Sequence, residues 1–174
     1  ECKGLLKTAI RDNDPVMFFE HKMLYTTKFN DVPEVEEDVC IPFGRARIVA
    51  EGADITVVTN SMMTIKAEKA VRQLQKEGIS AELIDLRTIV PLDTETIIRS
   101  VKKTGKLLIV DEGHLSFGIT GEIASRIMPD VFYDLDAPIQ RMGTADVPLP
   151  FSPALEFPLI PDEKKIAAKI REMV

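Results

Sequence analysis

The sequence contains only two cysteines, Cys2 and Cys40, and they lie far apart in the chain. Two such residues provide neither the CxxC spacing of a zinc site nor the disulfide framework of a small secreted domain. No apolar stretch approaches the roughly 20 residues that a helix needs to cross a bilayer. These absences predict an intracellular protein without a membrane partner.

Positive charge is also scarce, because the formal net charge at pH 7 is −6. A nucleic-acid partner requires Lys and Arg concentrated on one surface. Lys102, Lys103 and Lys106 do cluster, but at a predicted helix end, where cations oppose the helix dipole. The composition, 45% hydrophobic and 29% charged, is that of an ordinary globular protein. It predicts no nucleic-acid partner.

Apolar strands alternate with amphipathic helices from residue 44 onward. Continuously apolar strands are typical of a parallel sheet that is covered on both faces, and strand–helix alternation indicates right-handed crossovers. The predicted strands are residues 45–50, 55–60, 81–85, 106–110 and 131–135. The fold class is therefore predicted as α/β, with three α/β/α layers and a mostly parallel sheet.

Capping residues mark the predicted helix ends in this part of the chain. Gly78 and Gly105 follow apolar helical stripes, at the position where a left-handed C-cap is expected. Asp93 is a plausible N-cap for a helix through Lys103. A last helix is predicted over residues 162–173.

The N-terminal part has a different organisation. Residues 1–11 have helical periodicity, Pro15 breaks the helix, and residues 16–20 are predicted to form a buried strand. Residues 21–43 have no sustained periodicity and are interpreted as a connector between domains. The chain starts with Glu-Cys-Lys-Gly rather than Met, so we expect a fragment with three parts: residues 1–25 from a preceding domain, a linker at 26–43 and a second domain at 44–174.

Polar residues follow the predicted strands, at the edge where α/β folds bind ligands. Asp111, Glu112 and His114 could act as acids, bases or metal ligands; they could equally be solvated or contact another subunit. The Arg87 guanidinium could fork onto a carboxylate or phosphate, with a structural ion pair as the alternative. Asp134 completes this set of strand ends.

Three further segments have a functional and a structural interpretation. The turn at 118–121 could cradle a phosphate with its amides, but it lacks the P-loop and dinucleotide signatures, which favours a close-packing turn. His21 could titrate near neutral pH or simply be polar at a strand exit. Ser61 lacks the G-x-S-x-G context of a nucleophile.

The turn at Asp12-Asn13-Asp14 lies beside helix-terminal carbonyl groups, which have no partners within the helix. Hard cations prefer such oxygen clusters. Asp-Asn-Asp-Pro is also ordinary turn chemistry, which favours a simple helix-terminating turn.

Several segments in order resemble one enzyme family. They are GLLKTAIRDNDPVMFFEHKMLY, ADITVVTNSMM, ELIDLRTIVPLD, LLIVDEGHLSFGITGEIASRIM and LDAPIQRMGTADVPLPFSPALE. Together they resemble the second half of the β subunit of thiamine-diphosphate-dependent 2-oxo-acid dehydrogenases, which include the pyruvate, branched-chain 2-oxo-acid and acetoin enzymes. The resemblance implies a transketolase C-terminal-like domain preceded by the tail of a pyrimidine-binding domain.

The resemblance also implies partners and cofactors. An α subunit would complete an α2β2 heterotetramer that binds thiamine diphosphate with magnesium between subunits, and a dihydrolipoyl acyltransferase core would dock near residues 160–174. Coenzyme-activating and catalytic residues would lie upstream of Glu1, so this portion contributes none. The location would be the bacterial cytoplasm or the mitochondrial matrix.

One family site falls on this sequence. Several β subunits of this family bind potassium through carbonyl oxygens, and the matching block AIRDNDP places them at Ala9, Ile10, Asp12 and Asp14. Asp14 departs from the Asn often found there, and at least one further ligand would lie upstream.

The leading hypothesis is therefore that the chain is part of a 2-oxo-acid or acetoin dehydrogenase, which passes an acyl unit to a lipoyl group. The alternatives are a non-catalytic assembly module and a fragment of a transketolase or deoxyxylulose-phosphate synthase, in which Arg87 or the Gly118 turn would contact a substrate phosphate.

Overall fold

The computed structural model describes residues 1–27 and 39–174, and its centre is a five-stranded sheet. The strands are β1 (Arg47–Ala50), β2 (Ile55–Thr59), β3 (Ala81–Asp85), β4 (Leu107–His114) and β5 (Gln140–Thr144). Their spatial order is β1-β3-β2-β4-β5. Only the edge strand β1 is antiparallel to its neighbour; the other pairs are parallel. The predicted mostly parallel sheet is confirmed.

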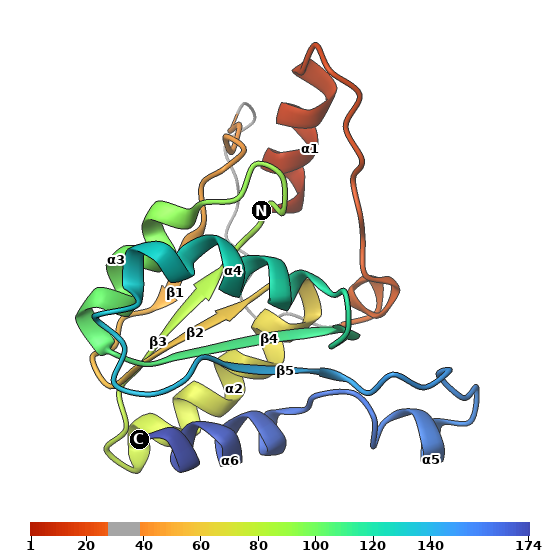
Figure 1. Ribbon diagram of the computed structural model, residues 1–174. Coiled ribbons are helices and arrows are strands. Elements are labelled where there is room, and N and C mark those ends of the chain that lie inside the picture. The colour runs from red at the N-terminus through yellow and green to blue at the C-terminus, as the bar shows by residue number, and fades with distance from the viewer. Residues whose placement is uncertain (28–38) are drawn as a thin grey trace.

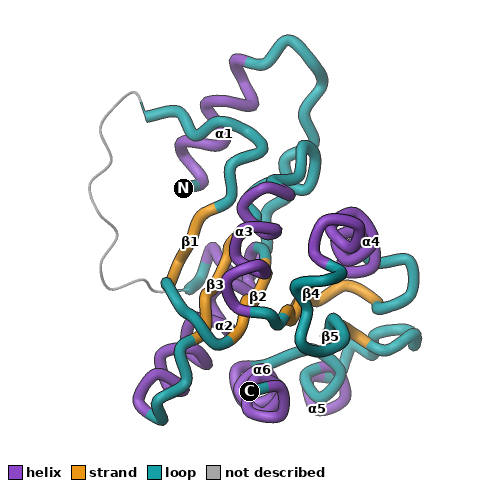
Figure 2. Tube along the Cα trace, turned by 60° about the vertical axis from the view of Figure 1, so that its left-hand side comes forward, coloured by secondary structure: helices purple, strands orange, loops and turns teal. Residues whose placement is uncertain are grey.

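Two helical layers cover the sheet (Figures 1 and 2). One layer contains α2 (Ser61–Lys76) and α6 (Glu163–Met173), and the other contains α3 (Thr94–Thr104) and α4 (Ile119–Val131). In β4, Leu108 belongs to the first core and Leu107 to the second, because alternate side chains of a strand point to opposite faces. The three-layer α/β/α architecture is confirmed.

The capping residues act as the sequence predicts. The Asp93 carboxylate accepts a hydrogen bond from the Thr96 N–H at 3.0 Å and starts α3. Gly105 ends α3 with φ +69°, and Gly78 adopts φ +88° just after α2. Glycine reaches this left-handed region without the steric cost of a Cβ atom.

The predicted strand at 131–135 is wrong. Helix α4 continues through Val131, and a turn follows, so Asp134 does not lie at a strand end. The last strand is instead β5, whose sequence QRMGT contains one large apolar residue, Met142. Its pairing with β4 creates the strand, whereas periodicity alone gives no signal there. A short helix, α5 (Pro153–Glu156), follows it.

The N-terminal segment begins with the predicted helix, α1 (Cys2–Arg11). The predicted strand at 16–20 is wrong, because these residues form neither a helix nor a strand within the described structure. Met17 is 79% and Phe19 85% exposed. A 3-10 helix, η1 (Lys22–Tyr25), follows; the part of the predicted connector at 28–38 lies outside the described residues. Among the described helices, none is long and apolar enough to span a membrane.

Candidate functional site at the carboxyl edge of the sheet

Left-handed backbone concentrates at the carboxyl ends of the central strands. Among described non-glycine residues, positive φ angles occur at Ser61 (+46°), Arg87 (+57°) and Phe117 (+56°). These residues follow β2, β3 and β4 respectively. Such conformations cost about 1–3 kcal/mol each and persist only where surrounding contacts impose them. This edge of the sheet is therefore the candidate location of a functional site.

Arg87 forks onto a carboxylate, as one of its two predicted roles requires. Its Nε and Nη2 atoms lie 3.2 and 2.5 Å from Oε1 of Glu1. Nη1 of Arg47, at the start of β1, lies 2.8 Å from the same oxygen. Burial opposes the charge of Glu1, but hydrogen bonds from the two arginines hold the pKa of this carboxyl below its usual value. The carboxylate belongs to the chain itself, so the structural ion pair is the confirmed alternative.

Glu1, Arg47 and Arg87 are called the clamp below. Asp85 lies beside this clamp and is only 9% exposed. Its carboxylate accepts the backbone N–H of Arg87 at 3.1 Å, which helps to impose the left-handed turn. Burial raises the pKa of Asp85, since the charged form loses its hydration. A small cavity of about 230 Å³ is lined here by Glu1, Leu24, Arg47, Val49, Ser61, Thr64, Ile65, Glu68 and Asp85.

Asp111, Glu112 and His114 do not converge on one point. Asp111 accepts the N–H of Gly113 at 2.9 Å, and the Nδ1 atom of His114 lies 2.9 Å from the Ala145 carbonyl oxygen. The Glu112 carboxylate pairs with His21 in the N-terminal segment. Among the described residues, no group of three or more His, Cys, Asp or Glu side chains could hold a metal ion. The three residues therefore make separate structural contacts.

His21 is the partner of Glu112. Its Nε2 atom lies 2.9 Å from Oε1 of Glu112, and its Nδ1 atom accepts the N–H of Met23 at 3.3 Å. The second contact assigns Nε2 as the protonated nitrogen of the neutral ring. His21 thus starts η1 and ties it to the end of β4.

The segment predicted as a turn at 118–121 is the start of α4, with Gly118 as the N-cap residue and residues 119–121 in the helix; the predicted close packing applies to Gly118. A Cβ atom on Gly118 would lie 2.1 Å from the His114 carbonyl oxygen, which explains the glycine without a ligand. The Thr120 hydroxyl is buried and has no hydrogen-bond partner within the described structure. Ser61 is exposed at the start of α2, and both histidines make contacts elsewhere.

The predicted cation ligands lie at the end of α1. The Asp12 N–H donates to the Ala9 carbonyl oxygen at 3.4 Å, and the Asp12 carboxylate accepts the Asp14 N–H at 2.9 Å. Asp12, Asp14 and Ile10 are exposed. These bonds are those of an Asx turn that ends a helix.

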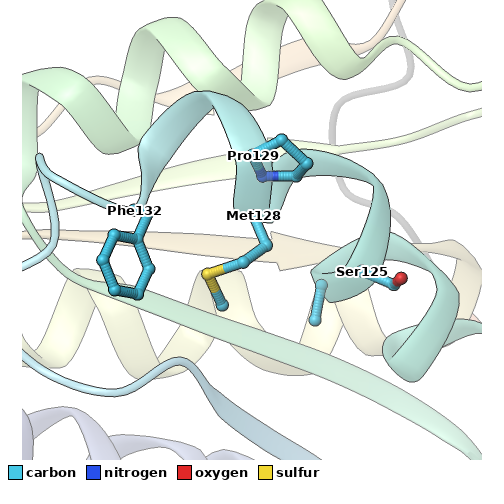
Figure 3. A pocket seen from close by; sticks show the side chains of 5 residues that line it. Ser125, Met128, Pro129 and Phe132 are labelled. Atoms are coloured by element: carbon cyan, nitrogen blue, oxygen red, sulfur yellow. The ribbon is translucent and has the colours of Figure 1, made fainter.

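A larger apolar groove of about 460 Å³ lies on α4, lined by Ala124, Ser125, Met128, Pro129 and Phe132. Figure 3 shows the side chains of Ser125, Met128 and Phe132 in succession along the helix. The neighbouring Tyr133 is 96% exposed. The groove has no charged lining residue and differs in character from the carboxyl edge.

Sequence reasoning missed two members of the clamp. The sequence predicts Arg47 only as part of the strand at 45–50 and Glu1 only as part of the helix at 1–11. The alternation of charged and apolar residues at 45–50 signals that Arg47 points away from the core. No signal in the sequence pairs it with a carboxylate 46 residues away.

Strand order, the antiparallel edge strand and the two helical layers define a doubly wound α/β domain. The sequence profile of the family described as "Transketolase, C-terminal domain" matches residues 44–166. The chain therefore belongs to the transketolase C-terminal domain family, and the fold predicted from the resemblance is confirmed.

Curated relatives are similar along nearly the whole chain. The β subunit of the pyruvate dehydrogenase E1 component of Rickettsia felis is 48% identical over 98% of this chain and 52% of the relative. The 2-oxoisovalerate dehydrogenase β subunit of Bacillus subtilis is 43% identical, over 99% and 53%. The β subunit of an acetoin:2,6-dichlorophenolindophenol oxidoreductase of Cupriavidus necator is 45% identical, over 99% and 50%. The predicted resemblance to β subunits is confirmed, and the chain spans about half their length.

Solved transketolases share the fold. A split-gene transketolase described as an inactive β4 tetramer has a TM-score of 0.66 and 27% identity, and the alignment covers 82% of this chain and 45% of that one. A transketolase of Pichia stipitis has a TM-score of 0.52 at 15% identity, with coverage of 74% and 18%. The second similarity supports the fold alone.

Proposed function

We propose that the intact subunit is the β subunit of a thiamine-diphosphate-dependent dehydrogenase that decarboxylates a 2-oxo acid or cleaves acetoin, and transfers the acyl unit to a lipoyl group. The observation that carries this proposal is similarity of 43–48% identity over 98–99% of the chain to three β subunits of such enzymes. The proposed partner is an α subunit in an α2β2 assembly. The relatives come from bacteria and from mitochondria, the two proposed locations.

Within this enzyme, the present portion would serve assembly and not chemistry. Its carboxyl edge holds ion pairs between parts of the chain, and Asp111, Glu112 and His114 diverge. The described residues do not fit a magnesium–diphosphate group, because they provide no cluster of metal-ligating side chains. The coenzyme would supply the carbanion chemistry from a site formed by other parts of the enzyme.

The substrate is not encoded in an obvious way in this portion. Relatives named for pyruvate, 2-oxoisovalerate and acetoin differ by only five percentage points in identity to the chain. The β subunits named for pyruvate dehydrogenase alone span the same range, from 48% to 43%, so overall identity does not select among these substrates.

The division at residues 25 and 44 is part of the proposal. The family profile begins at residue 44, which supports the start of the second domain there. Met17 and Phe19 are largely exposed, as expected for a segment whose apolar side chains pack against the remainder of a longer subunit. Residues 1–25 would then be the tail of the pyrimidine-binding domain.

A potassium site at Ala9, Ile10, Asp12 and Asp14 remains a proposal. The carbonyl end of α1 and a tight Asx turn place oxygen atoms near one another, which supports it. In the intact enzyme, replacing potassium by sodium at constant ionic strength should lower the melting temperature. A Tm independent of the cation would contradict the site.

The surface near residues 160–174 is the proposed contact for an acyltransferase core. Ile166 and Ile170 of α6 are buried in the core of this domain, so a partner could use only the outer, polar face. Lys164 is exposed on that face. Substituting it by Glu should weaken co-sedimentation with the acyltransferase and leave α6 packed.

The central test uses the full-length subunit co-produced with its α subunit. The complex is expected to decarboxylate at least one of the 2-oxo acids, or cleave acetoin, only when thiamine diphosphate and magnesium are added. The 174-residue chain with the same additions is expected to be inactive. Turnover by this chain alone would overturn the assignment.

A second candidate is an assembly module without a role in an active enzyme. The apolar groove on α4 favours it, as does similarity to a transketolase described as an inactive β4 tetramer. Analytical ultracentrifugation separates the candidates: the module should self-associate without an α subunit. A monomer over the micromolar range would count against it.

A further inference from the structure

The Glu1 carboxylate joins three separate elements at the carboxyl edge. Glu1 is the N-cap residue of α1, Arg47 begins β1, and Arg87 follows β3. One oxygen atom of Glu1 lies within hydrogen-bond distance of three donor atoms of the two guanidinium groups.

Arg87 is the fixed half of this clamp. Its side chain is 18% exposed, against 50% for Arg47. Its backbone is left-handed at φ +57°, and the buried Asp85 carboxylate holds its N–H. A strained backbone that is held in this way points the guanidinium in one direction. Two donors of that guanidinium engage the carboxylate, which defines its geometry more strictly than a single ammonium contact.

The side of α1 has a second fixed contact. Gly4 is the only buried residue of the helix, and a Cβ atom on it would lie 2.8 Å from Cγ1 of Ile41. The Thr8 hydroxyl donates to the Ile41 carbonyl oxygen at 2.7 Å. A helix that is fixed at its N-terminus and along its side has a defined axis direction. Figure 1 shows α1 beyond the arrowheads of β2 and β3.

We propose that Glu1, Arg47 and Arg87 form an orientation latch, which sets the angle between α1 and the sheet domain. The inference rests on the proposed function, in which α1 belongs to the half of the subunit that faces the coenzyme. The latch would therefore position that half for coenzyme binding without contacting the coenzyme. Its members are positioning residues.

The first test measures the angle directly, in the intact α2β2 complex without its native surface cysteines. Spin labels at Lys3→Cys on α1 and Lys102→Cys on α3 report the distance between the helix and the domain. Arg87→Gln is expected to broaden or shift this distance distribution, and Arg87→Lys, which keeps the charge but loses the fork, should have an intermediate effect. The matched control is Arg72→Gln, whose wild-type side chain is 75% exposed and pairs with Glu68 within α2.

The second test measures the dissociation constant of thiamine diphosphate in the same complexes. Arg87→Gln should raise it about two- to fivefold, the range that corresponds to losing a partly exposed ion pair. Turnover at saturating coenzyme should remain near that of the wild type. Arg72→Gln should change neither quantity.

The outcomes separate the two claims. A wild-type complex without coenzyme-dependent turnover would overturn the proposed function, while the label distances would still decide whether the latch sets the angle. A wild-type complex that turns over, combined with an unchanged distance distribution in Arg87→Gln, would overturn the latch. A loss of turnover at saturating coenzyme would also overturn it, because it would place Arg87 in the chemistry.

Discussion

The sheet domain buries two cores of large apolar side chains, although Phe117, Tyr133 and Phe151 are exposed on it, whereas no large apolar side chain of residues 1–27 is buried. Leu83 and Ile84 of β3 are completely buried, while Ile10, Met17 and Phe19 are 75–85% exposed. Charges differ in the same way. Glu82 is 2% exposed and paired with Lys103, whereas the N-terminal segment meets the domain through ion pairs with partly exposed members. The domain is stabilised by its own cores, and the segment is positioned by these polar contacts together with Leu24, which packs against the first core.

The largest expected effect tests this contrast in apolar packing. Leu83→Ala should destabilise the chain by about 3–4 kcal/mol, because it leaves a cavity between the helical layer and the sheet. Phe19→Ala is the matched control and should change stability by less than about 0.5 kcal/mol, since its ring is already in water. Urea unfolding of both variants provides the measurement. A large loss in Phe19→Ala would show that the segment has a core of its own.

The same contrast explains which elements could be predicted. Apolar runs such as residues 55–59 and 107–110 encode their strands locally, because each residue of the run is buried. The QRMGT strand depends on pairing with β4, so the sequence around Met142 does not reveal it. The VMFFE segment at 16–20 has the pattern of a buried strand but pairs with no strand among the described residues. The hydrophobic periodicity of a segment indicates the secondary structure that would bury its apolar residues. It does not indicate whether another segment pairs with it.

The candidate site was predictable in its location but not in its contacts. The polar strand ends pointed to the carboxyl edge, and the forking role of Arg87 followed from the chemistry of its guanidinium. Its partner Glu1 lies 86 residues away, and no local pattern encodes such a pair. Asp111 and His114 appeared adjacent in sequence, but each makes a separate contact with the backbone.

The second prediction addresses the buried charge. Lys103→Met should cost about 2–3 kcal/mol, because it leaves the Glu82 carboxylate buried without its cation; the value is below that of a fully buried pair since Lys103 is 44% exposed. Burial opposes the charge of Glu82, but hydrogen bonds led by that of Lys103 hold its pKa below the usual 4.5. The stabilisation is thus present above pH 4.5 and lost as the pH falls through the lowered pKa.

The control for the Lys103→Met substitution is Lys102→Met, which removes a lysine whose acidic partner is partly exposed. Lys102 is the neighbouring lysine on α3, 49% exposed, and its Nζ atom lies 4.0 Å from Asp134. Its loss should change stability by less than about 0.5 kcal/mol. Equal effects of the two substitutions at pH 7 would show that burial of Glu82 does not distinguish the pairs.

The third prediction compares two turns of the sheet domain. Gly105→Ala and Gly78→Ala both force a Cβ atom into the left-handed region, at a cost of about 1 kcal/mol. At Gly105 the new atom would also lie 2.2 Å from Oδ2 of Asp136, whereas nothing lies within 4 Å at Gly78. Gly105→Ala should therefore cost about 1–2 kcal/mol, the larger of the two. Adding Asp136→Ala should reduce its effect to that of Gly78→Ala, as measured by thermal unfolding.

The smallest expected effect is a gain of stability on substituting Asp85, which lies between the sheet domain and the N-terminal segment. Burial raises the pKa of Asp85, and the neighbouring Glu1 carboxylate adds to this. The folded chain therefore holds this proton to a higher pH than the unfolded chain, in which the pKa is near 3.8. The favourable contribution is complete below 3.8 and is lost as the pH rises through the raised pKa. Asp85→Asn is neutral throughout and keeps an acceptor for the Arg87 N–H, so its stability relative to wild type should increase over that window and then level off.

Urea midpoints measured from pH 3.5 to 8 provide the test. A constant difference over this range would mean that Asp85 is solvated, and that the boundary between the domain and the segment is open to water.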